Sequence, residues 1–257
     1  MFLLIQATVF LFGLHDASTH RISVDGVERE FILYPPSKPR SENGAPVLLV
    51  FHGHGGTARN IARRTKMHDL WPEAIVIYPQ GLSGVAGITD PEGKKTGWQK
   101  TPGSLDDRDV HFFDALMTSV KTQFKVNDKQ VFLMGHSNGS MFVYVLWSQR
   151  GEQIAAVCTA CAQNGLLIQK APRRSCFAIA GENDPIVPFK NQVQQLDRVK
   201  QCLRIADTIK EDRKYLTRQT TADGLELVTY LHPGGHELPQ VILPDVVAFF
   251  KRQMPPK

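Results

Sequence analysis

Short apolar segments recur along this chain at intervals that suit the strands of one sheet. Each is nearly continuous in apolar residues, which is typical of a strand covered on both faces. The segments expected to form such strands are residues 46–51, 74–78, 131–134, 154–159 and 176–181. Residues 225–231 alternate between apolar and polar side chains instead, and this pattern favours a strand at the edge of the sheet.

Segments with a helical spacing of apolar residues separate these strands. They cover residues 60–70, 110–124, 140–150, 191–206 and 241–252. Near the N-terminus, strand-like runs at residues 21–24 and 28–34 flank Asp25-Gly26, a two-residue signal for a β-hairpin. Alternating strands and helices predict an α/β fold, with a mostly parallel central sheet and helices on both faces.

The composition adds size and charge to this picture. With 257 residues, 42% of them hydrophobic, the chain can bury the core of one domain, which we assign to residues 19–257. The 30 basic and 25 acidic residues leave a net charge of +5, which is typical of a mixed surface. Basic clusters such as residues 170–174 are short and contain no aromatic residue, so we expect no nucleic-acid partner.

Residues 2–14 form an apolar run that is interrupted only by Gln6 and Thr8. The run is shorter than the ~20 residues that span a bilayer, so we expect no stable membrane insertion. It matches the core of a secretory signal, and we expect residues 1–18 to be a signal peptide and the protein to be secreted or periplasmic. An extra N-terminal strand or helix is the structural alternative, because no Lys or Arg precedes the run.

The pattern Gly135-x-Ser137-x-Gly139 lies between a predicted strand and a predicted helix. A serine on such a sharp turn takes a strained backbone, and side chains two positions away would collide with it. Glycine removes these collisions. The turn also places Ser137 at a helix N-terminus, where amides and the helix dipole favour negative charge on a bound oxygen. The pattern therefore predicts a nucleophile elbow for acyl transfer, with His136 pointing away from the nucleophile.

A glycine-rich loop with the sequence HGHGG follows the predicted strand at residues 46–51. In hydrolases built from strands and helices, such a loop gives a second oxyanion donor beside the amide that follows the nucleophile. We therefore expect the backbone N–H groups of His54 and Asn138 to form the oxyanion hole, with His52 packed under the loop. The two histidines could also suggest a metal site, but no acidic or cysteine partner lies at ligand spacing, so we expect no metal.

Ser137, Asp184 and His236 each follow a predicted strand, so a parallel sheet brings them to one edge. Their order along the chain is that of the α/β-hydrolase triad. We expect Ser137 to attack, His236 to take and return its proton, and Asp184 to orient the imidazole. His232 is a rival base and Glu182 a rival acid. The glycine pair before His236 and the proline after Asp184 favour the first assignment.

Residues 82–105 form a long predicted loop, rich in Gly, Pro and Thr, in which Trp98 is the one large aromatic residue. Loops of this length are usually either functional or disordered. We therefore assign Trp98 to the wall of a substrate pocket, and pinning of the loop to the core is the alternative. Asp106, Asp107 and Asp109 fall where the next helix begins. We interpret them as first-turn charges that suit the helix dipole rather than as a catalytic pair.

The chain holds 4 cysteines, at positions 158, 161, 176 and 202. An even number could pair in an exported protein. Cys158-x-x-Cys161 has the spacing of a redox pair, but it ends an apolar segment and has no second such motif or histidine cluster nearby. Buried thiols and one structural disulfide are both compatible with the sequence, and metal binding is not expected.

A set of ordered motifs runs through the chain. The motifs are Tyr78-Pro79-Gln80-Gly81 with the later Gly97-Trp98, Asp106-Asp107-Arg108-Asp109-Val110, Gly135-His136-Ser137-Asn138-Gly139 and Asp184-Pro185-Ile186-Val187-Pro188. Together they resemble the polyhydroxybutyrate-depolymerase and feruloyl-esterase family of α/β-hydrolases, from about Arg21 to the C-terminus. The resemblance implies the α/β-hydrolase fold and an exported serine esterase with the triad Ser137, Asp184 and His236. It also implies hydroxyalkanoate, aryl or acylated-carbohydrate esters as substrates.

One segment departs from the pattern of this family. The family often has a tryptophan shortly after the histidine, whereas here the run is His236-Glu237-Leu238-Pro239. The departure weighs against binding of a polymer. Small-molecule and polymeric esters both stay candidate substrates.

We therefore expect a serine carboxylic-ester hydrolase that works through an acyl-serine intermediate and needs no cofactor. A serine peptidase of the same fold is an alternative, although no charged or propeller-like domain that would admit peptides is recognisable. A non-catalytic binding protein with this fold is a second alternative, and the presence of all three triad residues argues against it. The sequence leaves the acyl group, the alcohol and the oligomeric state open.

Overall fold

The computed structural model describes residues 18–38, 42–84, 90–164, 166–205 and 209–254. The apolar run at residues 2–14 lies outside these ranges, so the signal peptide stays a prediction. None of the described helices combines the length and the apolar composition needed to cross a bilayer.

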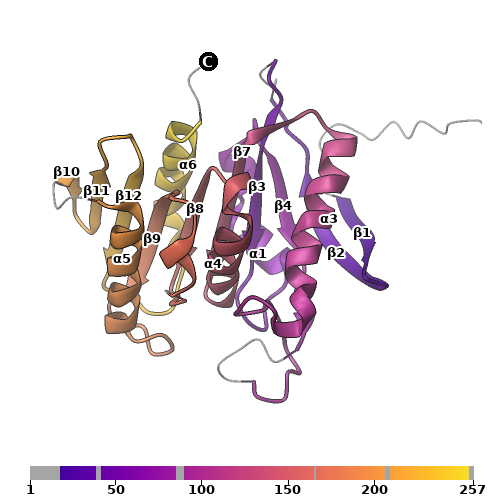
Figure 1. The fold of residues 1–257 in the computed structure, drawn as a ribbon, viewed down its shortest axis with the longest axis horizontal. Coiled ribbons are helices and arrows are strands. Elements are labelled where there is room, and N and C mark those ends of the chain that lie inside the picture. The colour runs from indigo at the N-terminus through magenta and orange to yellow at the C-terminus, as the bar shows by residue number, and fades with distance from the viewer. Residues whose placement is uncertain (1–17, 39–41, 85–89, 165, 206–208, 255–257) are drawn as a thin grey trace, which may run out of the picture.

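Among the described residues, ten strands form one sheet in the order β1-β2-β4-β3-β7-β8-β9-β12-β11-β10 (Figure 1). Their bounds are Ser18–Val24 (β1), Val27–Tyr34 (β2), Ala45–Phe51 (β3), Ile75–Pro79 (β4), Val126–His136 (β7), Ala156–Ala160 (β8), Ser175–Gly181 (β9), Ile209–Arg213 (β10), Leu216–Thr220 (β11) and Glu226–His232 (β12). The strands from β4 to β12 run parallel, and antiparallel strands extend the sheet on both sides. The predicted mostly parallel central sheet is therefore confirmed.

The central strands are the most apolar ones. β3, β8 and β9 are buried along their whole length, as their continuous apolar segments predict. Parallel strands point their carboxyl ends to the same edge of the sheet. The segments that follow β3, β7, β9 and β12 therefore meet at one edge, and these segments carry the predicted site residues.

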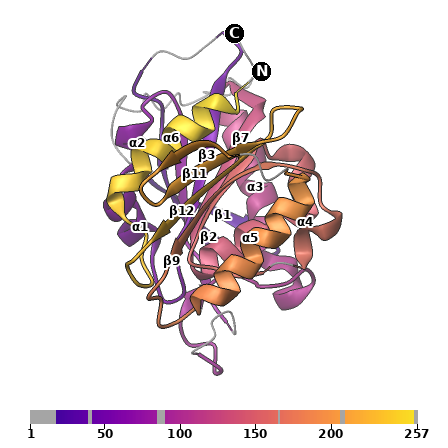
Figure 2. The same ribbon diagram turned by 90° about the vertical axis from the view of Figure 1, so that its left-hand side faces the viewer.

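Helices cover both faces of this sheet, as predicted (Figure 2). One face carries α3 (Arg108–Gln123), α4 (Asn138–Arg150) and α5 (Phe189–Leu203), and the other carries α1 (Ala58–Thr65), α2 (Met67–Leu70) and α6 (Leu243–Arg252). Short 3-10 helices lie at Ser104–Asp107 (η1), Gly151–Gln153 (η2), Leu167–Lys170 (η3) and Gln240–Ile242 (η4).

The alternation of side chains along β3 shows how one apolar strand serves two cores. Val47, Leu49 and Phe51 pack with α3 and α4, whereas Leu48 and Val50 pack with α1 and α6. Successive side chains of a strand point to opposite faces of the sheet, so a strand between two helical layers has to be apolar at every position.

The prediction that residues 225–231 form an edge strand is wrong. β12 pairs in parallel with β9 and antiparallel with β11, and β10 lies beyond β11. The sequences of β10 and β11, IKEDR and LTRQT, hold few apolar residues, so they gave no signal of a buried strand. The alternation along β12 marks a strand next to a polar hairpin rather than the edge itself.

The helix predicted at residues 60–70 is divided into two. α1 ends at Thr65, Lys66 takes a left-handed conformation with φ of 44°, and α2 begins at Met67. Left-handed backbone is usually marked by glycine, so a lysine at this position hides the break from a reading of the sequence.

Within the predicted loop at residues 82–105, β5 (Leu82–Ser83) and β6 (Thr96–Gly97) pair in a small two-stranded sheet. The 3-10 helix η1 follows, in which Asp106 and Asp107 have φ of 54° and 52°. These two aspartates therefore precede α3 and do not lie in its first turn, where we had placed them.

Asp109 does lie in the first turn of α3, but it is fully buried and its role is larger than a first-turn charge. Its carboxylate accepts hydrogen bonds from Arg29 Nη2 and from the amide of Gln99, each at 2.8 Å. Arg29 is itself buried and lies 4.1 Å above the ring of Phe112. Burial lowers the pKa of Arg29, and the charge of Asp109 opposes this shift. The pair ties β2 to α3 and to the segment that follows β6.

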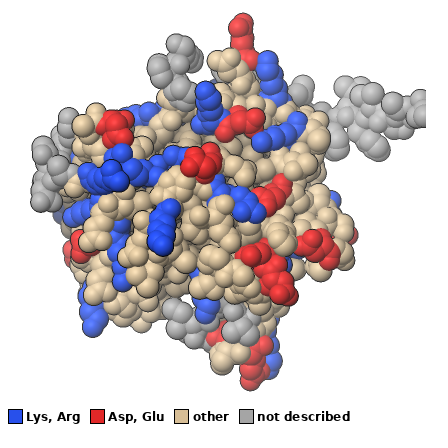
Figure 3. Space-filling model, in the orientation of Figure 1, with Lys and Arg blue, Asp and Glu red and all other residues tan. Residues whose placement is uncertain are grey.

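On the face drawn in Figure 3, basic and acidic side chains lie close together over most of the surface. Arg150 pairs with Asp114 at 2.7 Å, and Arg173 pairs with Asp223 at 2.8 Å. Cations that are matched by carboxylates in this way differ from the unpaired basic stripe of a nucleic-acid-binding surface.

We expect the Asp109→Ala substitution to lower the free energy of unfolding by about 3–5 kcal/mol, because it leaves the Arg29 charge buried without a partner. The matched control is Asp114→Ala on the same helix. It breaks a half-buried pair with Arg150 and should lower the free energy of unfolding by about 1 kcal/mol or less. Urea unfolding of both variants measures the two values. Equal small losses would show that the buried pair is not required for stability.

Candidate active site

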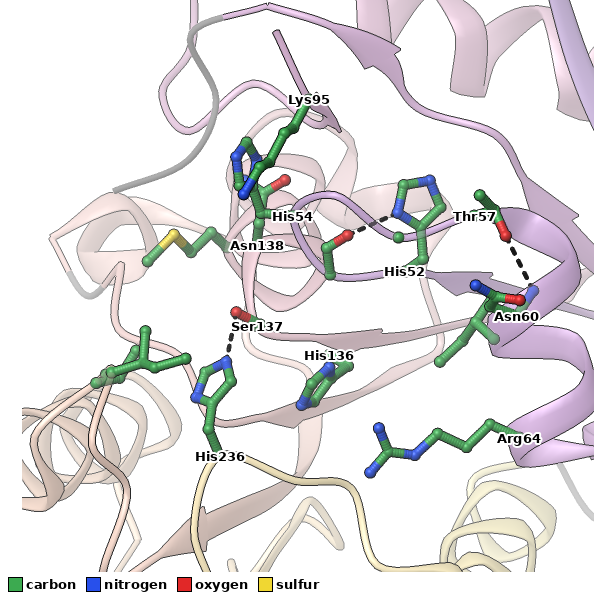
Figure 4. Close-up of a pocket in the computed structure, with 16 residues that line it drawn as sticks. His52, His54, Thr57, Asn60, Arg64, Lys95, His136, Ser137, Asn138 and His236 are labelled. Atoms are coloured by element: carbon green, nitrogen blue, oxygen red, sulfur yellow. Dashed lines mark hydrogen bonds between the residues drawn. The ribbon is translucent and has the colours of Figure 1, made fainter. Parts of the chain in front are cut away.

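Three side chains from different parts of the chain form one hydrogen-bonded row at the carboxyl edge of the sheet. The Ser137 Oγ lies 2.7 Å from His236 Nε2 (Figure 4). His236 Nδ1 lies 2.8 Å from Asp184 Oδ2. The sequence prediction placed these three residues at one edge, and the geometry brings them within hydrogen-bonding distance of one another.

The position of Ser137 depends on close packing of the backbone around it. Ser137 has φ of 54°, a conformation that non-glycine residues rarely adopt. A Cβ atom on Gly135 would lie 2.5 Å from the backbone of Gly139, and one on Gly139 would lie 2.3 Å from the carbonyl oxygen of Phe51. Both glycines are therefore required, because the turn presses β3, β7 and α4 together.

Asp184 follows β9 in a turn that fixes both of its carboxylate oxygens. Oδ1 accepts hydrogen bonds from the amides of Ile186 and Val187 at 2.8 and 2.9 Å. Oδ2 accepts one from Gln192 Nε2 at 3.0 Å, besides its contact with His236. Burial alone would raise the pKa of Asp184, but these amides and the imidazole outweigh it and lower the pKa. The carboxylate is therefore ionised, and His236 donates its Nδ1 proton to it.

The loop that carries His236 packs its Gly235 backbone against Gly181, the last residue of β9. A Cβ atom on Gly181 would lie 2.1 Å from the carbonyl oxygen of Gly235, so the loop passes directly over the end of β9. The amide of Asn183 donates to the carbonyl of Gly234 at 3.1 Å. These contacts hold the turn of Asp184 and the loop of His236 together.

The rival residues do not join this row. His232 is 4% exposed, accepts a hydrogen bond from the Gly234 amide at 3.1 Å and stacks on Tyr230. Burial lowers its pKa. Glu182 is exposed, and its backbone amide pairs with the carbonyl of His232. Asp184 and His236 are therefore the pair that lies beside Ser137.

We expected His136 to point away from the nucleophile. In the structure it instead lines the same cavity as Ser137. Its ring centroid lies 5.1 Å from that of His236 (Figure 4). Burial lowers the pKa of His136 to about 3, so its imidazole is neutral near pH 7. It does not bond to Ser137, whose hydroxyl is paired with His236.

The glycine-rich loop after β3 is held from below by His52, as predicted. His52 Nδ1 donates to the carbonyl of Gly53 at 2.8 Å, and its Nε2 accepts from the amide of Gly81 at 3.0 Å. Burial lowers the pKa of His52 to about 4, so it stays neutral and keeps this arrangement. The amides of Gly55 and Gly56 donate to the carbonyls of Thr96 and Gly53, so neither of them is free to meet a ligand. The amide of His54 stays the candidate donor that the sequence suggested.

Trp98 is fully buried and is not among the residues that line the cavity. Its indole N–H donates to the carbonyl of His52 at 2.9 Å. Its ring stacks on that of Phe142, with 5.4 Å between the centroids, and meets the ring of Phe51 edge-on at 5.2 Å. The Asn138 side chain accepts from the Trp98 amide at 2.7 Å and donates to its carbonyl at 3.0 Å. Trp98 therefore pins its loop to the core, which is the alternative to the substrate wall to which we had assigned it.

A cavity of about 300 Å³ opens beside Ser137. Its apolar wall includes Ile61, Met141, Ile186 and Val187. The backbone of His54 and the first turn of α4 border the same space, so polar groups converge on the hydroxyl of Ser137 from a partly apolar pocket. A cavity of this kind suits a small organic ligand.

All four cysteines lie within the described residues, and none of them forms a disulfide. Cys161 has a position that the sequence did not reveal. Its Sγ donates to the carbonyl of Glu237 at 3.2 Å, and burial raises its pKa to about 12. Sγ and the nearest polar atoms of Asp184 and His236 all lie within 4.8 Å of one another, so these three residues form the described group that could hold a metal ion. In this structure the Asp184 and His236 atoms bond to each other instead.

No model of a known protein family matches the chain. It is 26% identical over 168 residues to the bifunctional acetylxylan esterase/xylanase XynS20E of Neocallimastix patriciarum, and the aligned region covers 64% of this chain and 23% of that relative. It is also 27% identical over 174 residues to feruloyl esterase C of Emericella nidulans, and this alignment covers 64% of this chain and 58% of that relative. The chain thus spans less than two thirds of the length of either protein.

A solved structure has the same architecture. The acetyl xylan esterase from Aspergillus awamori superimposes with a TM-score of 0.70 over 91% of this chain and 99% of that protein, at 13% sequence identity. At this identity the likeness shows the fold. The chain therefore has the α/β-hydrolase fold, and it is related in sequence to proteins named feruloyl and acetylxylan esterases.

Proposed function

We propose that this protein is a serine carboxylic-ester hydrolase that works through an acyl-serine intermediate. The observation that carries the proposal is the row from Ser137 Oγ through the His236 imidazole to the Asp184 carboxylate, with contacts of 2.7 and 2.8 Å. These are the contacts that a nucleophile, a general base and an orienting acid require.

In the first step, Ser137 Oγ attacks the carbonyl carbon of the ester while His236 Nε2 takes the hydroxyl proton. The positive charge that forms on the imidazole is stabilised by Asp184, which accepts the Nδ1 hydrogen bond and stays ionised. The same proton then passes from His236 to the leaving alcohol, and the acyl group remains on Ser137.

Negative charge develops on the carbonyl oxygen during this attack. We assign its stabilisation to the backbone amides of His54, in the loop after β3, and Asn138, in the first turn of α4. The N-terminal end of α4 adds the positive end of its dipole. In the second step, water attacks the acyl-serine, His236 again takes and returns the proton, and the acid product leaves.

The names of the relatives suggest which esters are attacked. Acetylxylan and feruloyl esterases act on acetyl and feruloyl groups according to their names, and the cavity beside Ser137 has a partly apolar wall. We therefore propose acetyl or aryl esters of carbohydrates as substrates. The run Glu237-Leu238-Pro239 offers no aromatic surface after His236, so we place hydroxybutyrate polymers second.

Two other functions fit the observations less well. A serine peptidase would use the same three residues, but the sequence relatives with stated activities are esterases. A non-catalytic binding protein has no need for an ionised Asp184 bonded to His236, or for a strained Ser137.

We expect Ser137→Ala to lower the turnover of short p-nitrophenyl esters by ~10⁴-fold or more, because the nucleophile is lost. A fluorophosphonate probe should label the unaltered protein at Ser137, and mass spectrometry of the labelled peptide checks the position. A folded protein that neither reacts with the probe nor hydrolyses any ester would disprove the proposal.

We expect His236→Ala to lower kcat by ~10³-fold or more, whereas His232→Gln should keep most of the activity. The reason is that His236 contacts Ser137, while buried His232 is neutral and contacts Gly234. If the His232 variant is the inactive one, our assignment of the base is wrong.

We expect acetylated and feruloylated sugars to give higher kcat/KM values than hydroxybutyrate oligomers. A panel that also contains simple acyl p-nitrophenyl esters measures the ranking, with the Ser137→Ala protein as the background. A clear preference for hydroxybutyrate oligomers would contradict this choice of substrate while leaving the ester-hydrolase proposal intact.

A further inference from the structure

Arg64 extends from the last turn of α1 into the cavity beside Ser137 (Figure 4). One hydrogen bond of its guanidinium group is a long one, from Nη2 to the carbonyl of Leu238 at 3.4 Å. In the part of the chain that the structure describes, no carboxylate lies within 4.0 Å of it. Arg29, Arg150 and Arg252 each bond to a carboxylate. Arg64 is thus a cation at the active site for which the described part of the chain provides no carboxylate partner.

The rest of the cavity wall gives this charge no counterpart. Lys95 also lines the cavity, and among the described residues no Asp or Glu does. The nearest site carboxylate, Asp184, has a fully buried side chain and faces His236. Asp90 does not line the cavity; its carboxylate accepts from the Lys95 amide at 2.7 Å and lies 3.5 Å from His54 Nε2. The described side chains that line the cavity therefore include two cations and no anion.

The imidazole of His136 adds a polar atom next to Arg64 (Figure 4). Its Nε2 is buried and has no hydrogen-bond partner among the described residues. Buried polar atoms are normally paired, so an unpaired one on a cavity wall indicates a group that a ligand completes. Arg64 and His136 both line the cavity beside Ser137.

We propose that Arg64 binds a carboxylate carried by the substrate, so that the enzyme prefers esters with an anionic acyl or alcohol part. This inference rests on the proposed ester-hydrolase function and names its substrate class. The planar guanidinium group can give two parallel N–H bonds to a carboxylate, and Lys95 attracts the same charge from another part of the wall. His136 is neutral and so adds no repulsion between cations.

The test compares esters that differ in one charge. In the acyl arm, p-nitrophenyl hemiglutarate is compared with its methyl ester. In the alcohol arm, 4-acetoxybenzoate is compared with methyl 4-acetoxybenzoate. In at least one arm, the acid should have the higher kcat/KM, mainly through a lower KM, and the preference should weaken as salt is added.

Variants on α1 separate a carboxylate contact from a general effect of charge. Arg64→Gln should lower the ratio of kcat/KM between acid and methyl ester by about 10- to 100-fold, and Arg64→Lys should restore part of it. The matched control is Arg63→Gln. Arg63 is on the same helix and bonds to Asn60, but it does not line the cavity. This control should leave the ratio unchanged.

Binding to the Ser137→Ala protein gives a readout that does not need catalysis. Calorimetry should show tighter binding of the preferred acid than of its methyl ester, and Arg64→Gln in this background should remove the difference. If both arms and the calorimetry show no Arg64-dependent preference, the inference is wrong, even when neutral esters are hydrolysed. Failure of the ester-hydrolase proposal would instead appear as a protein that no fluorophosphonate labels.

Discussion

The contact on which the site depends is the packing of the Gly139 backbone against the carbonyl of Phe51. No side chain fits there, since a Cβ atom on Gly139 would lie 2.3 Å from that oxygen. The contact brings the end of β3 against the start of α4, and Ser137 takes its positive φ in the turn between β7 and α4. The amides of the loop after β3 therefore lie beside the serine because of backbone packing, before any side-chain contact is considered.

Side-chain networks then fix the loops around this contact. Asp109 holds Gln99, the neighbouring Trp98 donates to the carbonyl of His52, and Asn138 bonds to both backbone groups of Trp98. The network joins the loop after β3, the segment after β6 and the first turn of α4. A residue assigned to the substrate wall is thus part of the support of the site, because its indole fits the core between the helix and the loop.

Charge is distributed unevenly around Ser137. Burial keeps His52 and His136 neutral, and backbone amides keep Asp184 ionised. The row of Ser137, His236 and Asp184 therefore carries its negative charge at the buried end, away from the cavity. At the open end the wall holds Arg64 and Lys95. An ester would meet two cationic side chains next to a serine whose hydroxyl proton faces the His236 imidazole.

The sequence by itself determined the elements and the chemistry that depends on local pattern. Continuous apolar runs identified the buried strands, and the glycines around Ser137 identified the elbow. Ser137, Asp184 and His236 each follow a predicted strand, and this placed them at one edge, since parallel strands share their direction. Tertiary structure decided what depends on long-range contact. It placed β10 and β11 beyond β12, broke the helix at Lys66, buried Asp109 against Arg29, and turned Trp98 inward and Arg64 toward the cavity. Polar edge strands and single side chains carry no periodic signal, so their positions follow from packing partners far away in the chain.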